Sequence, residues 1–369
     1  MRLHLNMKKI TCGFIGLGLI GGSMAKALKN GNKNLKIIAF DINTETLELS
    51  RADGIADEIC TSIDEHFLEC DYVFLCAPVQ VNIANIDKIK NFLNKDAILT
   101  DIGSVKTQIH DYIHEAGLDS QFIGGHPMAG TERIGYINSK PIILENAYYI
   151  LTKTDKTSED KLNGFYELVK SMGAIPLVMD HKQHDYIVAA ISHVPHVISA
   201  SLVNLVKNSD SENGLMKLTA AGGFKDITRI SSSSPVMWQQ ICLTNTQNIS
   251  ALLGKYIDSL SEIKEQIDKG EGDSIIRFFK DAREYRESFI DSSGGPIKKV
   301  YTVHIDIADQ PGVLATVATL LAVHNINIKN IGIMHNREYQ SGSLQIEFND
   351  EHDQLEAIAL LKSHGYTVS

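Results

Sequence analysis

Residues 10–30 read ITCGFIGLGLIGGSMAKALKN and set the architecture of the first part of the chain. A β-rich run leads directly into the turn Gly16-Leu17-Gly18-Leu19-Ile20-Gly21, and a helical pattern follows. A second β-rich run, LKIIAFD, ends at Asp41, twenty positions beyond Gly21. This order of strand, glycine-rich turn, helix and acidic strand end is typical of the doubly wound sheet that binds dinucleotides.

The glycine turn predicts a pyrophosphate site, because glycines let backbone amides approach phosphates at the positive end of a helix. Asp41 would accept hydrogen bonds from both ribose hydroxyls of NAD and would repel the 2′-phosphate of NADP. A glycine turn without a ligand, and a capping or turn role for Asp41, are the structural alternatives. We therefore predict NAD as the cofactor. The residues expected to bind it are Gly16, Gly18, Leu19, Ile20, Gly21 and Asp41, with Ala77 and Pro78 at the end of the run DYVFLCAPV and Ser104 further on.

The rest of the chain shows three further changes of pattern. β-rich runs alternate with amphipathic stretches up to about residue 179, which indicates an α/β fold of Rossmann type with a mostly parallel sheet. Apolar residues then recur at helical spacing to about residue 290, and DSSGGP marks a linker. The last segment reads strand, helix, two strands, helix, strand, a ferredoxin-like order. We predict an NAD-binding Rossmann domain over 1–180, an all-helical domain over 181–291, a linker over 292–297 and a βαββαβ domain over 298–369.

Composition excludes several classes of protein. Apolar residues make up 43% and charged residues 22% of the 369 residues, which is typical of a globular chain with a buried core. The formal charge of −10 argues against a nucleic-acid partner. The five cysteines are scattered and form no C-x-x-C pair, so we expect neither disulfides nor a metal site. No leader or membrane-spanning run is evident, and we predict a cytoplasmic protein with no membrane partner.

Two motifs are expected where strands of the sheet end, facing the cofactor. Ser104 lies in DIGSVK, where its hydroxyl could contact the nicotinamide or simply cap a helix that starts near residue 105. His126 lies in GGHPMAGTE, held between glycines and a proline. An imidazole at this place can take a proton or a hydrogen bond from a substrate hydroxyl during hydride loss. A purely structural histidine is the alternative.

The helical region carries two further candidate groups. SHVPH places His193 and His196 on nearly one helical face; no third ligand supports a metal, and a polar pair inside a helix bundle is the alternative. GGFKDITRI places Lys225 and Arg229 four positions apart, where a guanidinium could hold a carboxylate. A surface ion pair with Asp226 explains the same pattern.

These motifs, with Trp238, occur in an order that closely resembles the prephenate dehydrogenase family over nearly the whole chain. The resemblance implies NAD-dependent oxidative decarboxylation of prephenate to 4-hydroxyphenylpyruvate in tyrosine biosynthesis. It implies that His126 accepts a hydrogen bond from the ring 4-hydroxyl, that Ser104 orients His126 and the nicotinamide, and that Arg229 binds a substrate carboxylate. It also implies that the helical domains pair into a homodimer. The remaining substrate contacts that it suggests are Lys225, His196, the weaker candidate His193, Glu132 and Trp238.

The tail resembles the ACT domain, an amino-acid-sensing module. Its loop Asp309-Gln310-Pro311-Gly312-Val313-Leu314 matches the ligand-binding turn of that module, and Asn325 and Ile326 match a second ligand contact. Since the expected pathway product is tyrosine, we predict feedback inhibition by L-tyrosine through this domain. A tail that only assists dimerisation is the alternative.

Other functions stay open at this stage. An arogenate dehydrogenase would differ from a prephenate dehydrogenase in one group of its substrate. A β-hydroxyacid or imine dehydrogenase shares the domain order, but it would need a catalytic lysine on a helix and gives no reason for GGHPMAGTE. A non-catalytic NAD-binding amino-acid sensor would not need His126 or Arg229.

Overall fold

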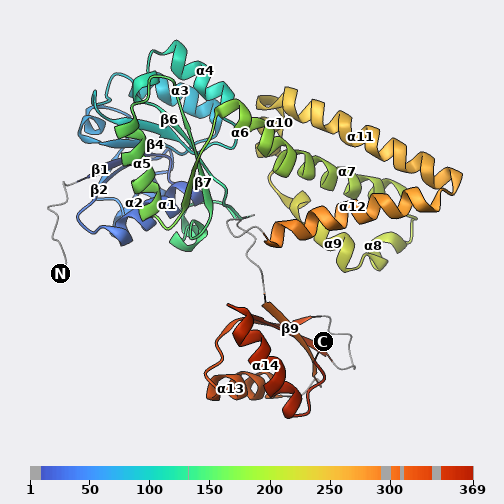
Figure 1. Ribbon diagram of the computed structural model, residues 1–369. Coiled ribbons are helices and arrows are strands. Elements are labelled where there is room, and N and C mark those ends of the chain that lie inside the picture. Colours follow the sequence, from blue (N-terminus) through green and yellow to red (C-terminus); the bar gives the residue numbers. More distant parts are fainter. Residues whose placement is uncertain (1–9, 132, 292–300, 308–310, 335–341, 369) are drawn as a thin grey trace. The chain divides into compact units, whose positions relative to one another are not determined.

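The computed structural model describes residues 10–131, 133–291, 301–307, 311–334 and 342–368. The chain divides into two compact units, 1–270 and 271–369, and each is described by itself (Figure 1). Unit 1 is α/β up to its last strand and all-helical from residue 181 onward. The predicted linker, residues 292–297, lies outside the described residues.

A five-stranded parallel sheet in the order β3-β2-β1-β4-β5 forms the centre of the α/β part of unit 1 (Figure 1). The strands are β1 (Thr11–Ile15), β2 (Lys36–Phe40), β3 (Glu58–Cys60), β4 (Tyr72–Leu75) and β5 (Ile98–Asp101). The chain reverses its winding direction between β1 and β4, and this is the point at which open α/β sheets bind nucleotides. The prediction of a doubly wound parallel sheet is confirmed.

Three more strands extend this architecture: β6 (Ile123–Pro127), β7 (Tyr148–Lys153) and β8 (Ile175–Val178). A parallel bridge between Leu99 and Phe122 joins β6 to β5. β6 and β7 pair antiparallel. The other described strand pairs of unit 1 are parallel, so the prediction of a mostly parallel sheet is confirmed. Among its described residues, the segment between β6 and β7 contains only the short turns η3 (Tyr136–Asn138) and η4 (Pro141–Ile143), and no crossover helix there forces these strands to run parallel.

Helices cover both faces of the sheet, because each face carries its own apolar cluster. On one face Met24 and Leu28 of α1 and Phe165 of α5 pack on Phe14 and Phe74, whose rings stack at 4.7 Å. On the other face the side chains of α3 and α4 pack on β1, β4 and β5. The helical elements of this part are α1 (Leu19–Gly31), α2 (Thr44–Ala52), η1 (Glu65–Glu69), α3 (Val79–Ile89), α4 (Thr107–Glu115), η2 (Asp119–Gln121) and α5 (Glu159–Ser171).

The helical part of unit 1 has a small core around Ala189, Val194, Ile241 and Ile249. Its elements are α6 (His181–Val188), the π-helical turn η5 (Ala189–His193), α7 (Val194–Ser209), α8 (Leu215–Thr219), α9 (Gly222–Thr228), η6 (Arg229–Ser232), α10 (Pro235–Thr244) and α11 (Thr246–Lys269). Among the described residues, one helical run, 181–209, is long and apolar enough to cross a membrane by length and composition alone. Many apolar side chains of these helices are exposed, as expected for helices that pack against another surface.

Unit 2 begins with α12 (Gly272–Asp291) and continues into a small α/β fold. Its elements are β9 (Tyr301–Ile307), α13 (Val313–Val323), β10 (Ile328–Met334), β11 (Gly342–Phe348) and α14 (Glu351–Ser363). The sheet order is β10-β11-β9, and α13 and α14 pack on this sheet through an apolar core. The predicted last strand is reduced to a single bridge between Val368 and Ile305.

Candidate active site

The glycine turn joins β1 to α1 at the carboxyl edge of the sheet. Gly16 has φ +102°, and a Cβ on Gly21 would lie 2.6 Å from the Gly16 carbonyl oxygen, so the close approach of α1 to the turn needs both glycines. A Cβ on Gly18 would meet nothing within 4 Å, and no side chain caps the first turn of α1. Open space therefore adjoins a helix N-terminus whose N–H groups can receive a phosphate.

Asp41 follows β2 and supports this turn. Its Oδ2 accepts a hydrogen bond from Leu17 N at 2.7 Å, and its Oδ1 accepts one from Asn43 N at 2.8 Å. Both oxygens keep a second lone pair, since a carboxylate offers about four acceptor positions. Asp41 therefore does stabilise a turn, and its remaining acceptor positions can still bind ribose hydroxyls.

The turn after β4 lies beside the glycine turn, with the Cys76 backbone 3.1 Å from the position of a Gly16 Cβ. Ala77 and Pro78 belong to this turn, and Pro78 is the N-cap of α3. Buried Asn82 fixes the loop: its Oδ1 accepts from Ala77 N at 3.2 Å and its Nδ2 donates to Ala77 O at 2.7 Å. Sequence reasoning missed Asn82, because an asparagine in the first turn of a helix carries no distinctive signal.

A buried ion pair closes the end of β5. The Lys106 ammonium contacts Asp101 Oδ2, both side chains have no exposed surface, and Lys106 also donates to the Gly125 carbonyl at 2.7 Å. Asp101 in turn accepts from Gly103 N at 2.9 Å and from Gly125 N at 3.3 Å. The pair therefore joins the DIGSVK segment to β6.

Ser104 lies in this segment, before α4. Helix α4 begins at Thr107, and Lys106 is its N-cap, so the helix does not start at residue 105. Within the described part of the chain the Ser104 hydroxyl has no hydrogen bond, neither as a cap nor with the His126 ring.

His126 lies on β6 at the same edge of the sheet as the glycine turn, since β6 runs parallel to β5. Its Nδ1 is 2.8 Å from Nε2 of buried His184, whose Nδ1 is 2.8 Å from Asp185 Oδ1. Burial holds the pKa of His126 well below its usual value, and nearby His184, Lys106 and His193 add to this effect. The ring is therefore neutral at pH 7 and able to accept a proton.

The helical part supplies the other side of the site. His193 is buried, and its Nδ1 lies 3.2 Å from the Asn245 amide nitrogen. Because that nitrogen can only donate, the proton of neutral His193 is on Nε2. Burial lowers the pKa of His193 to about 4.

His196 and Trp238 form a second contact in this part, with stacked rings 3.8 Å apart. The Trp238 indole N–H is buried and has no hydrogen-bond partner among the described residues. Arg229 starts η6 near His196. Burial lowers the pKa of His196 most and the charge of Arg229 lowers it further, whereas the hydrogen bond with the Ser192 carbonyl raises it. A buried donor and a cation thus both lie near His196, as a carboxylate ligand would require.

The remaining predicted residues fall in different places. Lys225 lies on α9, one helical turn before Arg229, and both are exposed. In unit 2, Gly312 has φ +88° and precedes α13, where no side chain of a described residue caps the helix. Val313 and Leu314 begin that helix, whereas Asn325 and the buried Ile326 follow its other end. Glu132 and Asp309 lie outside the described residues.

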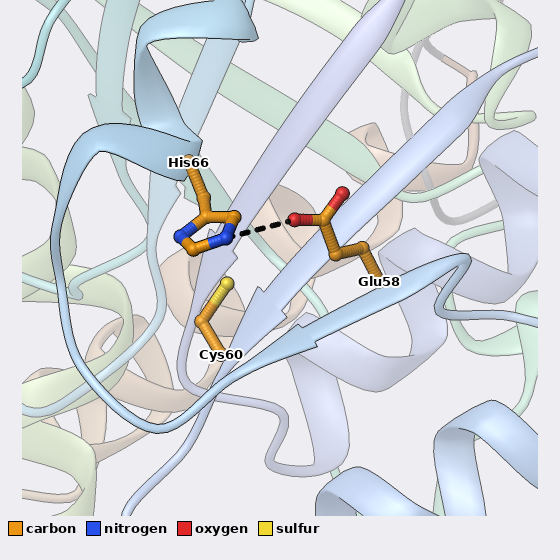
Figure 2. Close-up of side chains that lie close together, drawn as sticks. All are labelled: Glu58, Cys60 and His66. Atoms are coloured by element: carbon orange, nitrogen blue, oxygen red, sulfur yellow. Dashed lines mark ion pairs between the residues drawn. The ribbon is translucent and has the colours of Figure 1, made fainter.

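Another group of potential metal ligands lies at the edge strand β3, away from these residues: Glu58, Cys60 and His66 (Figure 2). His66 Nε2 is 3.4 Å from Glu58, and its Nδ1 is 2.5 Å from Asp64. The hydrogen bond to Asp64 raises the pKa of His66, and burial raises the pKa of the Cys60 thiol to about 11. Lys36 pairs with Glu58 at 2.9 Å. These charges balance one another as a surface ion-pair network.

The fold and this site define a class: a protein that binds a dinucleotide in a Rossmann-type domain and completes the site with a helical domain. Comparison with known proteins gives the family. Residues 24–177 match the family model "Prephenate dehydrogenase, nucleotide-binding domain", residues 180–281 match "Prephenate dehydrogenase, dimerization domain", and residues 303–362 match "AHAS small subunit-like ACT domain".

Prephenate dehydrogenase of Bacillus subtilis is 35% identical to this chain, over 96% of both proteins. The structure of Aquifex aeolicus prephenate dehydrogenase in complex with hydroxyphenyl propionate and NAD+ is 32% identical, covers 77% of this chain and 99% of its own, and has a TM-score of 0.72. Arogenate dehydrogenase of Synechocystis is 27% identical, covers 76% and 100%, and has a TM-score of 0.69. The chain belongs to the prephenate dehydrogenase family.

Proposed function

We propose that this chain oxidises and decarboxylates prephenate to 4-hydroxyphenylpyruvate with NAD, in tyrosine biosynthesis. The observation that carries the proposal is the position of His126, a neutral imidazole at the carboxyl edge of the sheet that also holds the glycine turn. The Bacillus subtilis prephenate dehydrogenase, at 35% identity, aligns over 96% of both chains, and a related structure is a complex with NAD+.

The residues present fit NAD. The uncapped N-terminus of α1 and the open space above Gly18 suit a pyrophosphate, and the free lone pairs of Asp41 suit ribose hydroxyls. When bound, NAD supplies the acceptor for a hydride from C4 of the substrate ring. Leu19 and Ile20 open α1 and complete the set of residues expected to border the dinucleotide.

His126 draws the proton of the ring 4-hydroxyl toward its imidazole while C4 loses its hydride. The resulting dienone loses the ring carboxylate as CO2, and the ring becomes aromatic. The proton returns from His126 to the phenolate oxygen, so the reaction consumes no proton overall. Ser104, without a hydrogen bond among the described residues, is free to orient the nicotinamide amide.

Arg229 holds a substrate carboxylate in this proposal, with Trp238 Nε1–H as a buried donor beside His196. Lys225, and Glu132 outside the described residues, stay proposed as further substrate contacts. His193, with its proton on Nε2, supplies a donor near His126. A guanidinium suits this role because it captures a carboxylate with two parallel hydrogen bonds.

We also propose a homodimer formed through the helical domain, an L-tyrosine effector site on the ACT-like domain, and a cytoplasmic location. The exposed apolar side chains of α7, α8 and α11 support the dimer. Gly312 at the start of α13, which no described side chain caps, supports an amino-acid carboxylate site.

NADH formation by the purified protein, measured with prephenate and separately with arogenate, tests the proposal. We expect NADH and CO2 in equal amounts with prephenate, and kcat/KM at least about tenfold lower with arogenate. A preference for arogenate would show that the chain is an arogenate dehydrogenase, as the related Synechocystis enzyme is named. NAD binding without turnover of either compound would favour a non-catalytic sensor.

A further inference from the structure

Three side chains form a continuous hydrogen-bonded row from α6 to β6. Asp185 Oδ1 lies 2.8 Å from His184 Nδ1, and His184 Nε2 lies 2.8 Å from His126 Nδ1. His184 is 0% and Asp185 is 1% exposed, so water does not compete for these contacts. We call Asp185, His184 and His126 the histidine relay.

The first member of the relay is an ionised carboxylate. Asp185 Oδ1 accepts from Lys106 N at 2.7 Å, and Oδ2 accepts from Thr107 N at 2.8 Å, at the N-terminus of α4. Burial opposes ionisation, but the hydrogen bonds from His184, Thr107 and Lys106 hold the pKa of Asp185 below its usual value. A carboxylate with two backbone donors can only accept from the imidazole beside it.

The protons of both rings follow from this carboxylate. His184 must carry its proton on Nδ1 in order to donate to Asp185, and burial lowers its pKa and keeps the ring neutral. Its Nε2 then has only a lone pair, so the proton between the two rings belongs to His126 Nδ1. Nε2 of the neutral His126 is left as a lone pair, and it has no hydrogen-bond partner among the described residues.

We propose that His184 and Asp185 are positioning residues that fix the ring proton of His126 on Nδ1 and so present Nε2 as the acceptor of the substrate hydroxyl proton. The inference rests on the proposed function for the identity of that hydroxyl, but the assignment of the ring proton rests on the row of contacts alone. An imidazole free to turn or to exchange its proton would spend part of its time with Nε2 protonated and unable to act.

The proton transfer balances within the relay. As the O–H bond of the substrate breaks, an N–H bond forms at His126 Nε2, and His126 becomes an imidazolium that still donates from Nδ1 to His184. The negative charge of Asp185 stabilises the His126 imidazolium through the two hydrogen bonds that His184 makes, one to each of them. The proton returns by the same bond when the ring becomes aromatic.

Other charged groups face the relay from neighbouring elements. The Lys106 ammonium opposes protonation of both rings, but its contact with Asp101 on β5 offsets that charge. His193 of η5 faces His126 and His184 and stays neutral, since burial lowers its pKa to about 4. Near neutral pH, Lys106 and His193 therefore keep their charge states, and proton transfer changes the charge of the histidine relay alone.

Nitrogen NMR of the full-length protein labelled with ¹⁵N-histidine tests the proton assignment directly, without substrate. The His126 signals are identified by their loss in His126→Asn. At pH 7.5 we expect a protonated Nδ1 and an unprotonated Nε2. A His126 ring protonated on Nε2 would overturn the proposal, whatever the substrate proves to be.

Kinetics of two His184 variants test the consequence. His184→Gln keeps an acceptor near the position of Nε2, whereas His184→Leu removes it. With prephenate, we expect kcat to fall by about 10-fold to 100-fold in the leucine variant and by clearly less in the glutamine variant, with KM and NAD affinity little changed. Equal kcat in both variants would show a packing role and overturn the proposal.

His110→Asn is the matched control, since His110 is another buried histidine, bonded to Thr152 and outside the relay. We expect it to keep the wild-type kcat, and a loss equal to that of His184→Leu would overturn the specific role of the relay. If prephenate is not turned over at all, the proposed function fails and the NMR result still stands for or against the proton assignment.

Discussion

Asp41 shows how one carboxylate serves both the fold and the ligand. Its two oxygens each accept one backbone N–H, from Leu17 and from Asn43, and thereby hold the glycine turn against the end of β2. The remaining lone pairs face the cofactor in our proposal. Since the same negative charge would meet the 2′-phosphate of NADP, cofactor choice depends on this residue.

We predict that kcat/KM is at least about tenfold higher with NAD than with NADP, which corresponds to about 1.4 kcal/mol or more. Asp41→Asn should lower this ratio, because the repulsion is lost. The ratio is its own control, since damage to the glycine turn affects both cofactors alike. Equal values of kcat/KM in the wild-type protein would refute the role given to Asp41.

At the scale of elements, the packing of α1 on the sheet gives two glycines of the same turn, Gly18 and Gly21, different roles. A Cβ on Gly21 would lie 2.6 Å from the Gly16 carbonyl oxygen and 2.9 Å from Cys76 Cβ, whereas a Cβ on Gly18 would meet no protein atom within 4 Å. Gly21 is thus required by the fold, and Gly18 borders the space reserved for the ligand.

Gly21→Ala should therefore lower the free energy of unfolding by about 1–3 kcal/mol, as overpacking does. Gly18→Ala should leave the melting temperature unchanged and weaken NAD binding by about tenfold or more, because the methyl group occupies the phosphate space. Thermal melts and NAD titrations of both variants provide the comparison. Loss of stability in Gly18→Ala, or normal NAD binding by it, would refute this assignment.

The buried histidines make stability depend on pH. Burial lowers the pKa of His110 to about 3 and that of His193 to about 4, whereas both are near 6.5 in the unfolded chain. Below pH 6.5 the unfolded chain binds protons that the folded chain does not. Each such histidine therefore lowers the free energy of unfolding by up to about 1.4 kcal/mol per pH unit as the pH falls from 6.5 toward the pKa of that histidine in the folded state.

We predict that the urea midpoint of unit 1 is constant near pH 7.5 and falls progressively from pH 6.5 to pH 5. His110→Asn should show a shallower decrease over the same range, because one of these groups is gone. A midpoint that does not change over this interval, or an identical slope in the variant, would contradict the buried, neutral state of His110.

Much of the architecture follows from local patterns, and the exceptions have physical causes. The glycine turn and Asp41 were predictable because backbone geometry demands these residue types at that spacing. Strands β3 and β8, of three and four residues, are hard to predict because such short runs show no alternation. The antiparallel pairing of β6 and β7 was not predictable either, since a strand pattern carries no direction.

The site was only partly predictable for a different reason. His126 is flanked by glycine and proline, and these neighbours distinguish it from a histidine that packs in the core. His184 and Asp185 lie in an ordinary helical pattern, and only the approach of α6 to β6 and α4 shows their partners. Two titratable side chains side by side in an apolar helical run were the available signal.

At the scale of the whole molecule, the ACT-like domain imposes a geometric condition on its ligand. Gly312 precedes α13 and Asn325 follows it, and the eleven residues of the helix span about 16 Å. One amino acid is too short to reach both ends. The two predicted contacts can serve the same ligand only if two copies of the domain each contribute one. The edge of β10, which pairs with no other strand among the described residues, would allow this.

We predict that L-tyrosine inhibits the full-length protein and that a chain ending at residue 291 keeps its activity but loses this inhibition. An effector can regulate only by binding two states unequally, so removing its domain removes the effect. Activity against tyrosine concentration for both proteins is the measurement. Unchanged sensitivity after truncation would place tyrosine at the active site instead.

The account depends most on His126 as the group that accepts the hydroxyl proton. The most direct test is kcat with prephenate and NAD for His126→Asn beside the wild-type protein, with NAD affinity measured in parallel. We predict a fall in kcat of about two orders of magnitude or more, and an NAD dissociation constant within about twofold of the wild type. A variant that keeps near-wild-type kcat would contradict the account.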